Sequence, residues 1–407
     1  MSIWTTFVRL CAVSLLGRLS YQMARSPVLP RFAQDLGSAP ELIGLIVAAS
    51  TITGVFIKLP AGALSDVLGR KRMMLLGCLF FAVPPFLYPF VHSPGTLLAL
   101  RFLHGVATAI FSPVASAFVA DLSKEERGEK LGWFAAAGDI GSTLGPLIGG
   151  LLLFYTASYQ MTYLTVGVFG LFPLLLILRL PDDEMPRHAG KTLGARSQQF
   201  WSGIREVLGS RAVVIASLLE AAMYMGYGAF LGFFPPYAKG IGLNDAQIAL
   251  VMGIQLATTM LAKPLSGRLS DRLGRKPMIL AGLLLCAATL PAIPTLASPW
   301  LLFPVSALFG LGVAIVTPST TALVADLVKG QRMGSAMGVF GTIWDTGEAG
   351  GPILAGFLIA SLGYSPAFTM IALLMAVVAL VFAVLVRDPQ AVQWAGMNIK
   401  TEEKKGL

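Results

Sequence analysis

The chain has 407 residues, of which 55% are hydrophobic and only 13% are charged, and its mean hydropathy is +0.74. Soluble domains carry about 25% charged residues, so this composition excludes an ordinary soluble protein. The formal net charge of +9 does not indicate nucleic-acid binding, because the basic residues lie in alternate loops between apolar segments, the pattern typical of membrane proteins.

Apolar segments follow one another along almost the whole chain. Each has about 20 residues, the length that crosses a bilayer as a helix, and we count about twelve of them. In lipid the backbone must satisfy its own hydrogen bonds, so each segment is predicted to be a helix. The segments fall near residues 4–27, 41–64, 73–92, 97–121, 131–155, 160–180, 212–236, 244–267, 277–297, 300–325, 335–360 and 366–386.

The positive charges predict the topology. Lys and Arg gather after the even-numbered segments, as at 70–72 and 272–276, while the odd-numbered connections carry little beyond Arg31 and Lys239. By the positive-inside rule, the even-numbered loops and both termini face the cytoplasm. Short loops without an N-x-[ST] acceptor favour a bacterial inner membrane. The three cysteines fall within predicted spans and are interpreted as apolar filling residues rather than disulfides.

The chain repeats itself after 205 or 206 residues. GALSDVLGRK at 62–71 returns as GRLSDRLGRK at 267–276, and Lys58 and Asp139 fall on Lys263 and Asp345. Two homologous halves are therefore predicted. They comprise a six-helix bundle at 1–180, a cytoplasmic linker at 181–211, a second six-helix bundle at 212–387 and a cytoplasmic tail at 388–407.

Three motifs carry a resemblance to a known family. They are the repeated decapeptide, RFLHGVATA beginning at Arg101, and GWFAAAGDIGSTLGPLIGG at 132–150. Together the motifs resemble the major facilitator superfamily, in particular its twelve-helix drug/proton antiporters. The resemblance implies an all-α membrane protein with twelve transmembrane helices in two pseudo-symmetric six-helix bundles. It also implies a transporter rather than an enzyme.

The decapeptide combines residues suited to a gate between the halves. Its glycines allow another helix to come close, and its aspartates can face the positive N-terminus of a facing helix while an arginine holds them. A simpler interpretation is that these charges only cap helices and set topology. The predicted gate residues are Gly62, Asp66, Arg70, Gly267, Asp271 and Arg275, with Lys58 and Lys263.

The fifth predicted helix carries a face without side chains. Gly141, Gly145 and Gly149 recur every four residues, and Pro146 and Gly150 lie beside them. Such spacing lets a partner helix approach closely, and the proline permits a bend. Family resemblance places this face at the interface of the halves and associates it with export by antiport. By itself the pattern indicates only tight packing.

Ionisable residues inside the predicted spans are the strongest functional candidates, because each is costly in lipid unless it is paired or hydrated. In the family, helix two meets helix eleven and helix eight meets helix five. This arrangement puts Lys58 opposite Asp345 and Glu348, and Lys263 opposite Asp139. We expect these pairs to be closed in the outward-facing state and broken in the inward-facing state, with a proton as the trigger. The alternative is that both lysines extend to the cytoplasm.

Glu220 is a further candidate for proton coupling. It lies early in the seventh span, with Tyr224 and Tyr227 on the same helix. An isolated buried carboxyl can load and release a proton. The alternative is that Glu220 is hydrated near the cytoplasmic end of its helix. Other acids that compete for this role are Asp139, Asp345 and Glu348.

Two arginines extend this set. Arg101 resembles the family's fourth-helix arginine, which is tied to proton coupling and to holding an acid in the cavity, so a partner is expected. Arg18 departs from the family's pattern. If Arg18 faces the cavity, an anionic or zwitterionic substrate is favoured, and if it faces helix five its role is structural. The predicted substrate site comprises Arg18, Tyr21, Tyr224, Tyr227 and Trp344.

The sequence thus predicts a proton-coupled secondary transporter, most simply an exporter of a small organic molecule by alternating access. Uptake by symport or uniport of an organic anion, and a non-transporting sensor, are the alternatives. The expected partners are a small-molecule substrate and the bilayer, and the protein is expected to be a monomer. No cofactor is expected besides the proton gradient, and three scattered histidines with no matching cysteines predict no metal site.

Overall fold

The computed structural model describes residues 3–122, 126–180, 211–328 and 333–386, with three isolated positions between 181 and 210. The predicted linker at 181–211 and the predicted tail at 388–407 lie almost wholly outside the described residues. Within the described part of the chain the protein is entirely helical, as predicted, with twelve long helices and one short helix, α2.

The first half of the chain holds six of the long helices. The short helix α2 and the 3-10 turn η1 extend α1 and α4 respectively. Their bounds are α1 Ile3–Arg25, α2 Val28–Asp35, α3 Pro40–Leu68, α4 Arg70–Ala82, η1 Pro84–Phe90, α5 Pro94–Leu122, α6 Arg127–Thr156 and α7 Tyr159–Leu178.

The second half repeats this order, with η2 extending α11. The bounds are α9 Arg211–Gly240, α10 Asp245–Leu273, α11 Arg275–Thr289, η2 Ile293–Thr295, α12 Pro299–Leu327, α13 Met333–Leu362 and α14 Tyr364–Leu385. Among the described residues, ten helical segments are long and apolar enough to cross a membrane, and α1 and α13 complete the set of twelve long helices.

Tight turns at glycine define the two ends of the bundle. Gly69 and Gly274, the second glycine of each decapeptide, have φ of 97° and 98° and join α3 to α4 and α10 to α11. Only glycine adopts this conformation without strain. We call this end, which the charges predict to be cytoplasmic, the inner end. The opposite end, with Gly37 and Gly242 at φ of 75° and 90°, is the outer end.

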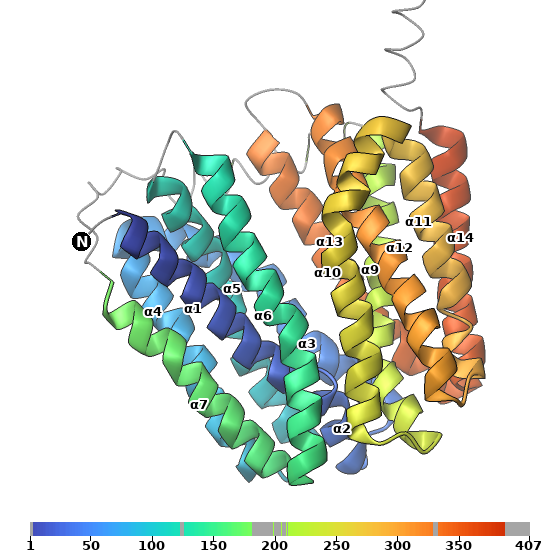
Figure 1. Ribbon diagram of the computed structural model, residues 1–407, viewed down its shortest axis with the longest axis horizontal. Helices are drawn as coiled ribbons and strands as arrows, with labels where there is room; N and C mark the ends of the chain where they lie inside the picture. Colours follow the sequence, from blue (N-terminus) through green and yellow to red (C-terminus); the bar gives the residue numbers. More distant parts are fainter. Residues whose placement is uncertain are drawn as a thin grey trace, which may run out of the picture.

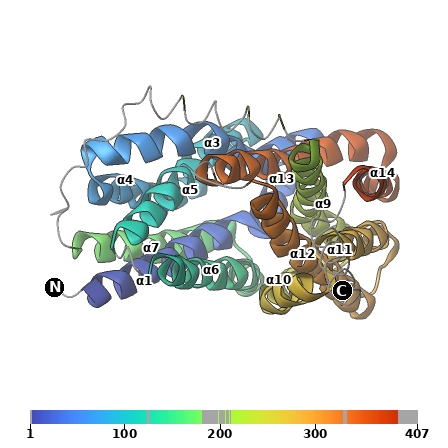
Figure 2. The same ribbon diagram turned by 90° about the horizontal axis from the view of Figure 1, so that it is seen from above.

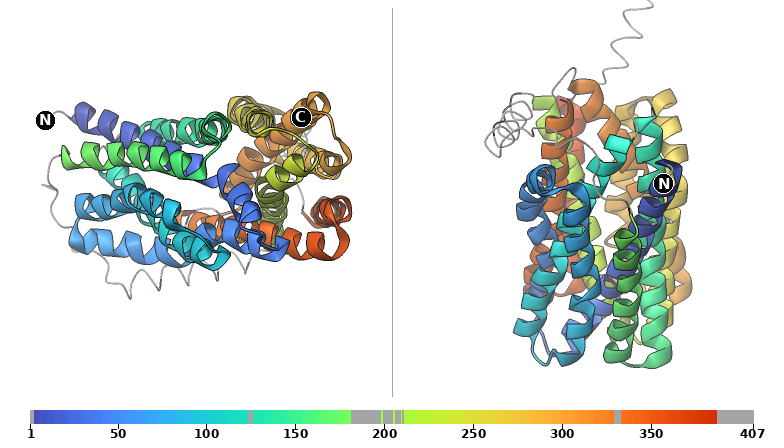
Figure 3. Two further views of the ribbon diagram at one scale, coloured as in Figure 1. Left: turned by 90° about the horizontal axis from the view of Figure 1, so that it is seen from below. Right: turned by 90° about the vertical axis from the view of Figure 1, so that its left-hand side faces the viewer.

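The helices form two groups that correspond to the two halves of the sequence (Figure 1). Seen from above, α3 runs beside α13 and α6 runs beside α10, so four helices make the junction (Figure 2). We call these two helix pairs the seam. The long helices of both halves run between the same two ends of the molecule (Figure 3, right), and those of the first half are tilted relative to those of the second (Figure 1). This is the arrangement that the repeat predicts.

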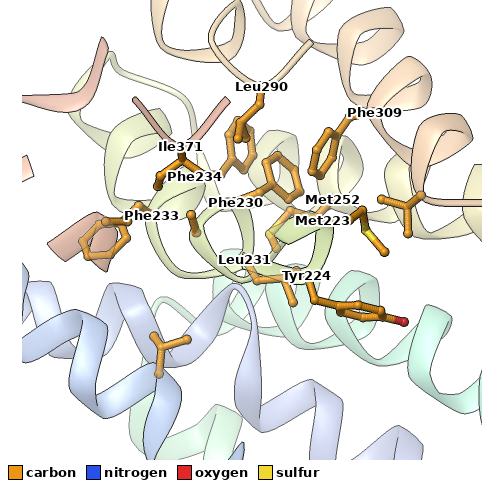
Figure 4. Packing of buried hydrophobic residues seen from close by; sticks show 14 of the residues in the cluster. Met223, Tyr224, Phe230, Leu231, Phe233, Phe234, Met252, Leu290, Phe309 and Ile371 are labelled. Atoms are coloured by element: carbon orange, nitrogen blue, oxygen red, sulfur yellow. The ribbon is translucent and has the colours of Figure 1, made fainter. Parts of the chain in front are cut away.

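The interior of the second half is packed largely with aromatic and aliphatic side chains. Phe230 stacks on Phe234 and lies 5.3 Å from Phe309, ring centre to ring centre. Figure 4 shows Tyr224 at the edge of this cluster, with its hydroxyl directed away from the phenylalanines. Leucines such as Leu261 and Leu380 are largely exposed on the outside of the bundle, as expected for side chains that face lipid tails.

The glycines of α6 pack against α1 of the same half, and the expectation that they form the interface between halves is wrong. A methyl group built at Gly141 would overlap the main-chain oxygen of Leu15, and one at Gly149 would overlap that of Met23. Gly145 faces Leu19 and Gln22 in the same way, with Pro146 beside it. The reason is that α6 packs against two helices through different faces. Its glycine face contacts α1, and another face contacts α10 of the second half.

Gly150 is the exception, because a methyl group there would meet Ala249 of α10 and Pro27. The second half repeats the α1–α6 contact. Gly347 lies against Ala221 and Gly351 against Met225. Gly141 and Gly347, like their partners Leu15 and Ala221, are 206 residues apart, which fixes the structural correspondence between the halves.

Candidate functional site

The seam is closed toward the outer end. A methyl group built at Gly44 of α3 would overlap the main-chain oxygen of Pro352 on α13. A methyl group built at Gly253 of α10 would lie 3.4 Å from the side chain of Leu147 of α6. An ionic contact reinforces this closure, since the buried Arg31 donates from Nε to Asp245 Oδ1 across the halves at 3.4 Å.

The seam ends, toward the inner end, at two ion pairs. Lys58 Nζ of α3 bonds Asp345 Oδ2 of α13, and Lys263 Nζ of α10 lies 3.6 Å from Asp139 Oδ2 of α6. Beyond them the helices separate. Nothing lies within 4 Å of a methyl group built at Gly132 of α6. Figure 1 shows α6 leaning away from α10 toward this end.

The expectation that these pairs break in the inward-facing state stays a prediction. Both pairs are made while the inner ends of α6 and α10 are apart. The reason is their depth: Lys58 precedes the end of α3 at Leu68 by about 15 Å, at 1.5 Å per residue. Helix ends can therefore diverge by a few turns without pulling the pairs apart.

The two pairs differ in burial. The Asp345 side chain is 11% exposed and the Asp139 side chain is 49% exposed, while both lysines are more than a third exposed. The lysines therefore reach toward solvent along their stems yet still bond acids of the opposite half. Because a buried carboxylate depends more on its partner, the Lys58–Asp345 pair is the stronger structural constraint.

We expected Glu348 to face Lys58, and this expectation is wrong. Glu348 faces Arg25 instead. Arg25 Nη2 of α1 bonds Glu348 Oε1 of α13 at 2.6 Å, and both side chains are nearly buried. Arg25 also approaches Thr51 Oγ1 at 3.4 Å. Arg25 lies inside the predicted span 4–27 but was not among the candidate residues, and the structure places it at the last residue of α1. Its spacing of seven residues from Arg18, two turns along one helix face, was the available signal.

The charges of the decapeptides bond within their own halves. Arg70 bonds Asp66 at 2.6 Å and Asp121 of α5 at 3.3 Å. In the second half Arg275 repeats the arrangement, with Asp271 and with Asp326 of α12. A methyl group built at Gly267 would meet only Pro318 of the same half, at 3.9 Å, which is an ordinary contact rather than the close approach expected. A gating role for these residues, and for Gly62, stays a prediction.

Glu220 is buried inside the second half. Only 1% of the residue is exposed, so the alternative that it is hydrated is wrong. Its Oε2 atom has no hydrogen-bond partner, and neither has the buried Ser319 Oγ of α12. A carboxylate with a free oxygen is costly in such a place, and a proton removes that cost.

Arg101 is fully buried in the first half, but not beside an acid. Its Nη2 donates to Tyr21 Oη at 3.3 Å and to Ser50 Oγ at 3.0 Å, and its guanidinium lies 4.9 Å from the centre of the Tyr21 ring. Arg101 Nε and Nη1 have no partner. Within the described residues, the expected acid is therefore replaced by hydroxyls and an aromatic face.

The predicted substrate residues separate into two environments. Tyr224 contacts Trp344 with ring centres 4.4 Å apart and Tyr227 with ring centres 5.9 Å apart, which forms an aromatic wall in the second half. Tyr21 lies instead with Arg101. Arg18 lies over α6, with its Nε 3.3 Å from a methyl group built at Gly138. Because α6 is the fifth predicted span, Arg18 has the second of the two placements considered, the structural one.

Two pseudo-symmetric helical halves with ionised side chains at their junction define a polytopic membrane transporter. The family comparison agrees: a model of the Major Facilitator Superfamily matches residues 10–223 and again residues 216–400. The chain belongs to this superfamily. It is therefore a secondary transporter rather than an enzyme, and its substrate is a small molecule.

Two curated relatives span most of the chain. An uncharacterized MFS-type transporter of Methanocaldococcus jannaschii is 25% identical over 382 residues, which cover 93% of this chain and 96% of the relative. The quinolone resistance protein NorA of Staphylococcus aureus is 23% identical over 335 residues, covering 82% of this chain and 84% of NorA.

Solved structures share the fold. The nucleoside transporter NupG matches with a TM-score of 0.80 at 13% identity, covering 94% of this chain and all of that one. A bacterial homologue of the human lysosomal transporter Spinster, in an inward-facing and unoccupied conformation, matches with a TM-score of 0.77 at 16% identity, covering 94% of this chain and 95% of that one. At this identity the likeness establishes the fold alone.

Proposed function

We propose that the protein exports a small organic molecule in exchange for protons. The observation that carries this proposal is Glu220, a carboxyl buried in the second half with one oxygen unpartnered. Such a group favours the protonated form when it is sealed and releases the proton when water reaches it. Proton binding and release at Glu220 can thus follow the alternation between conformations.

The ion pairs at the seam complete the coupling. Asp345 and Asp139 hold lysines of the opposite half, so protonation of either acid weakens the contact between halves. Proton and substrate need not touch each other. They need only favour different conformations, because coupling is a difference in affinity between states.

Export is favoured over uptake by two observations. The fifth-helix sequence resembles that of antiporting exporters, and the relative NorA is named for resistance to quinolones. We place the protein in a bacterial inner membrane as a monomer with both termini in the cytoplasm. We assign residues 1–180 and 212–387 to its two bundles, and 181–211 and 388–407 to the linker and tail.

The test uses purified protein in liposomes with an imposed pH gradient and norfloxacin, a quinolone, as the first probe. An antiporter accumulates norfloxacin in the compartment that is more acidic, because protons leave as the probe enters. Reversing the gradient must reverse the flux, whichever way the protein is inserted. A broader screen of organic cations, anions and zwitterions follows by thermal shift, since a ligand that binds the folded state raises its stability.

Accumulation in the more alkaline compartment would indicate symport and contradict the proposal. A norfloxacin flux that is the same with the pH gradient, with the reversed gradient and without either would indicate uniport. Absence of flux for every ligand that raises the unfolding temperature would favour the sensor.

A further inference from the structure

The ionisable residues inside the helices fall into two classes when the halves are compared. Lys58 and Asp345 have counterparts in Lys263 and Asp139, so these residues belong to the framework that the two halves share. Arg25 and Glu348 have none. At the positions 206 residues away are Leu231 and Ser142, both unable to form an ion pair.

The contact between Arg25 and Glu348 is incomplete. Glu348 bonds only Nη2 of the guanidinium, and Arg25 Nε is buried without a partner. Arg and carboxylate groups bind most strongly through two parallel bonds, so a donor of Arg25 is left for a second carboxylate. The pair joins the two halves, since Arg25 lies on α1 and Glu348 on α13.

An aromatic surface adjoins this pair. Trp344 precedes Glu348 by one turn of α13, and its ring contacts Tyr224 of α9. Gly228 of α9 lies against the main chain of Glu348, which places Tyr227 next to the acid in the same helix contact. Trp344 and Tyr227 are only partly buried, so their rings remain available to a ligand.

We propose that the transported compound is a zwitterion with an aromatic ring, which inserts between Arg25 and Glu348. Its carboxylate binds Arg25, its protonated amine binds Glu348, and its ring lies against Trp344 and Tyr227. One ion pair is replaced by two, so no buried charge is left without a partner. This inference rests on the proposed function in that the ligand is the transported compound, and it holds for either direction of transport.

The proposal predicts a rule of selectivity. A ligand that keeps only one charge leaves either Arg25 or Glu348 uncompensated, and binding weakens by about thirtyfold or more. It also links binding to the conformational cycle. The ligand opens one of the contacts that tie α13 to the first half, so binding lowers the cost of separating the halves there.

The test is calorimetric titration of the full-length protein in nanodiscs, without any gradient. Two probe series are used: phenylalanine and norfloxacin, each with its methyl ester, its N-acetyl derivative and the doubly blocked compound. In at least one series the zwitterion should bind about thirtyfold more tightly than either singly blocked compound. Arg25→Gln should abolish the preference for a free carboxylate only, and Glu348→Gln the preference for a free amine only.

Variants that keep the charge test the assignment further. Arg25→Lys and Glu348→Asp should retain most of each preference, and Arg272→Gln, at an exposed position of α10, should retain both. Circular dichroism and size-exclusion chromatography establish folding. Unchanged ratios in folded Arg25→Gln and Glu348→Gln protein would overturn the proposal and leave the pair a structural link. Equal affinity for all four compounds, or no binding in both series, would also overturn it.

The two proposals fail separately. Charge selectivity measured without a gradient does not depend on protons as the coupling ion. Retained selectivity with no response of flux to pH gradients would overturn proton coupling alone.

Discussion

The two halves of the molecule share a backbone but not their buried charges. In both, a glycine face presses one helix on another, at Gly141 on Leu15 and at Gly347 on Ala221. The first half, however, buries Arg101 where the second has Ser306, and the second buries Glu220 where the first has Ser14. Duplication thus preserved the packing, while the side chains that we propose handle protons and ligand diverged.

The contact between residues 18 and 138, and its counterpart between residues 224 and 344, is an example of this divergence. In the first half Arg18 lies over Gly138, and in the second the corresponding residues are Tyr224 and Trp344, whose rings meet edge to face. The same helix contact therefore presents a cation in one half and an aromatic wall in the other. The lesson is that positions which differ between the repeats are better functional candidates than positions which agree.

The largest effect is expected when Glu220, a buried carboxyl without a counterpart in the first half, is removed. Glu220→Gln should lower proton-driven transport by about 100-fold, the scale of losing a positioned proton-transfer group. Exchange of substrate across the membrane without a gradient should persist, because that step needs no proton. Transport in proteoliposomes measures both. Ser14→Ala, the matched change in the first half, should leave transport within twofold, and a similar loss there would erase the distinction between the halves.

A smaller, symmetric effect is expected at the shared glycines. Gly141→Ala and Gly347→Ala each place a methyl group on a main-chain oxygen and should destabilise the protein by about 1–3 kcal/mol. Gly132→Ala, with open space around it, should be neutral or stabilising by up to about 1 kcal/mol, because glycine is a poor helix former. Thermal unfolding of purified protein checks all three. Unequal losses at Gly141 and Gly347 would mean that the packing has diverged too.

The smallest effects are expected at the shared ion pairs, and they should be unequal. Lys58→Gln leaves the buried Asp345 without its partner and should cost about 1–2 kcal/mol, reduced from the cost of a fully buried pair because the lysine is partly exposed. Lys263→Gln frees an exposed acid and should cost less than about 1 kcal/mol. The unfolding midpoints give the order.

Exchanging the two residues of a pair gives the control. The double variant Lys58→Asp with Asp345→Lys should recover most of the stability lost in each single variant. No recovery in the double variant would show that the contact contributes nothing beyond its two side chains taken separately.

The sequence was sufficient for the fold because lipid leaves few choices. Span length, basic loops and the repeat predicted the helices and the opposition of Lys58 to Asp345 and of Lys263 to Asp139, since helix pairing follows from the family's arrangement. What the sequence did not determine is rotation about a helix axis. That rotation decides that Glu348 faces Arg25, that the α6 glycines face α1, and that Arg101 finds hydroxyls instead of an acid.

The glycine contacts also bear on how the protein is made. The contacts between α1 and α6 and between α9 and α13 each lie inside one half, so this close backbone approach of the first bundle can form in the membrane before the ribosome has finished the second. Two separately translated fragments should therefore fold independently and then associate through the helix contacts and ion pairs of the seam. A transporter built in this way can acquire a new substrate by altering one fragment while the other continues to assemble as before.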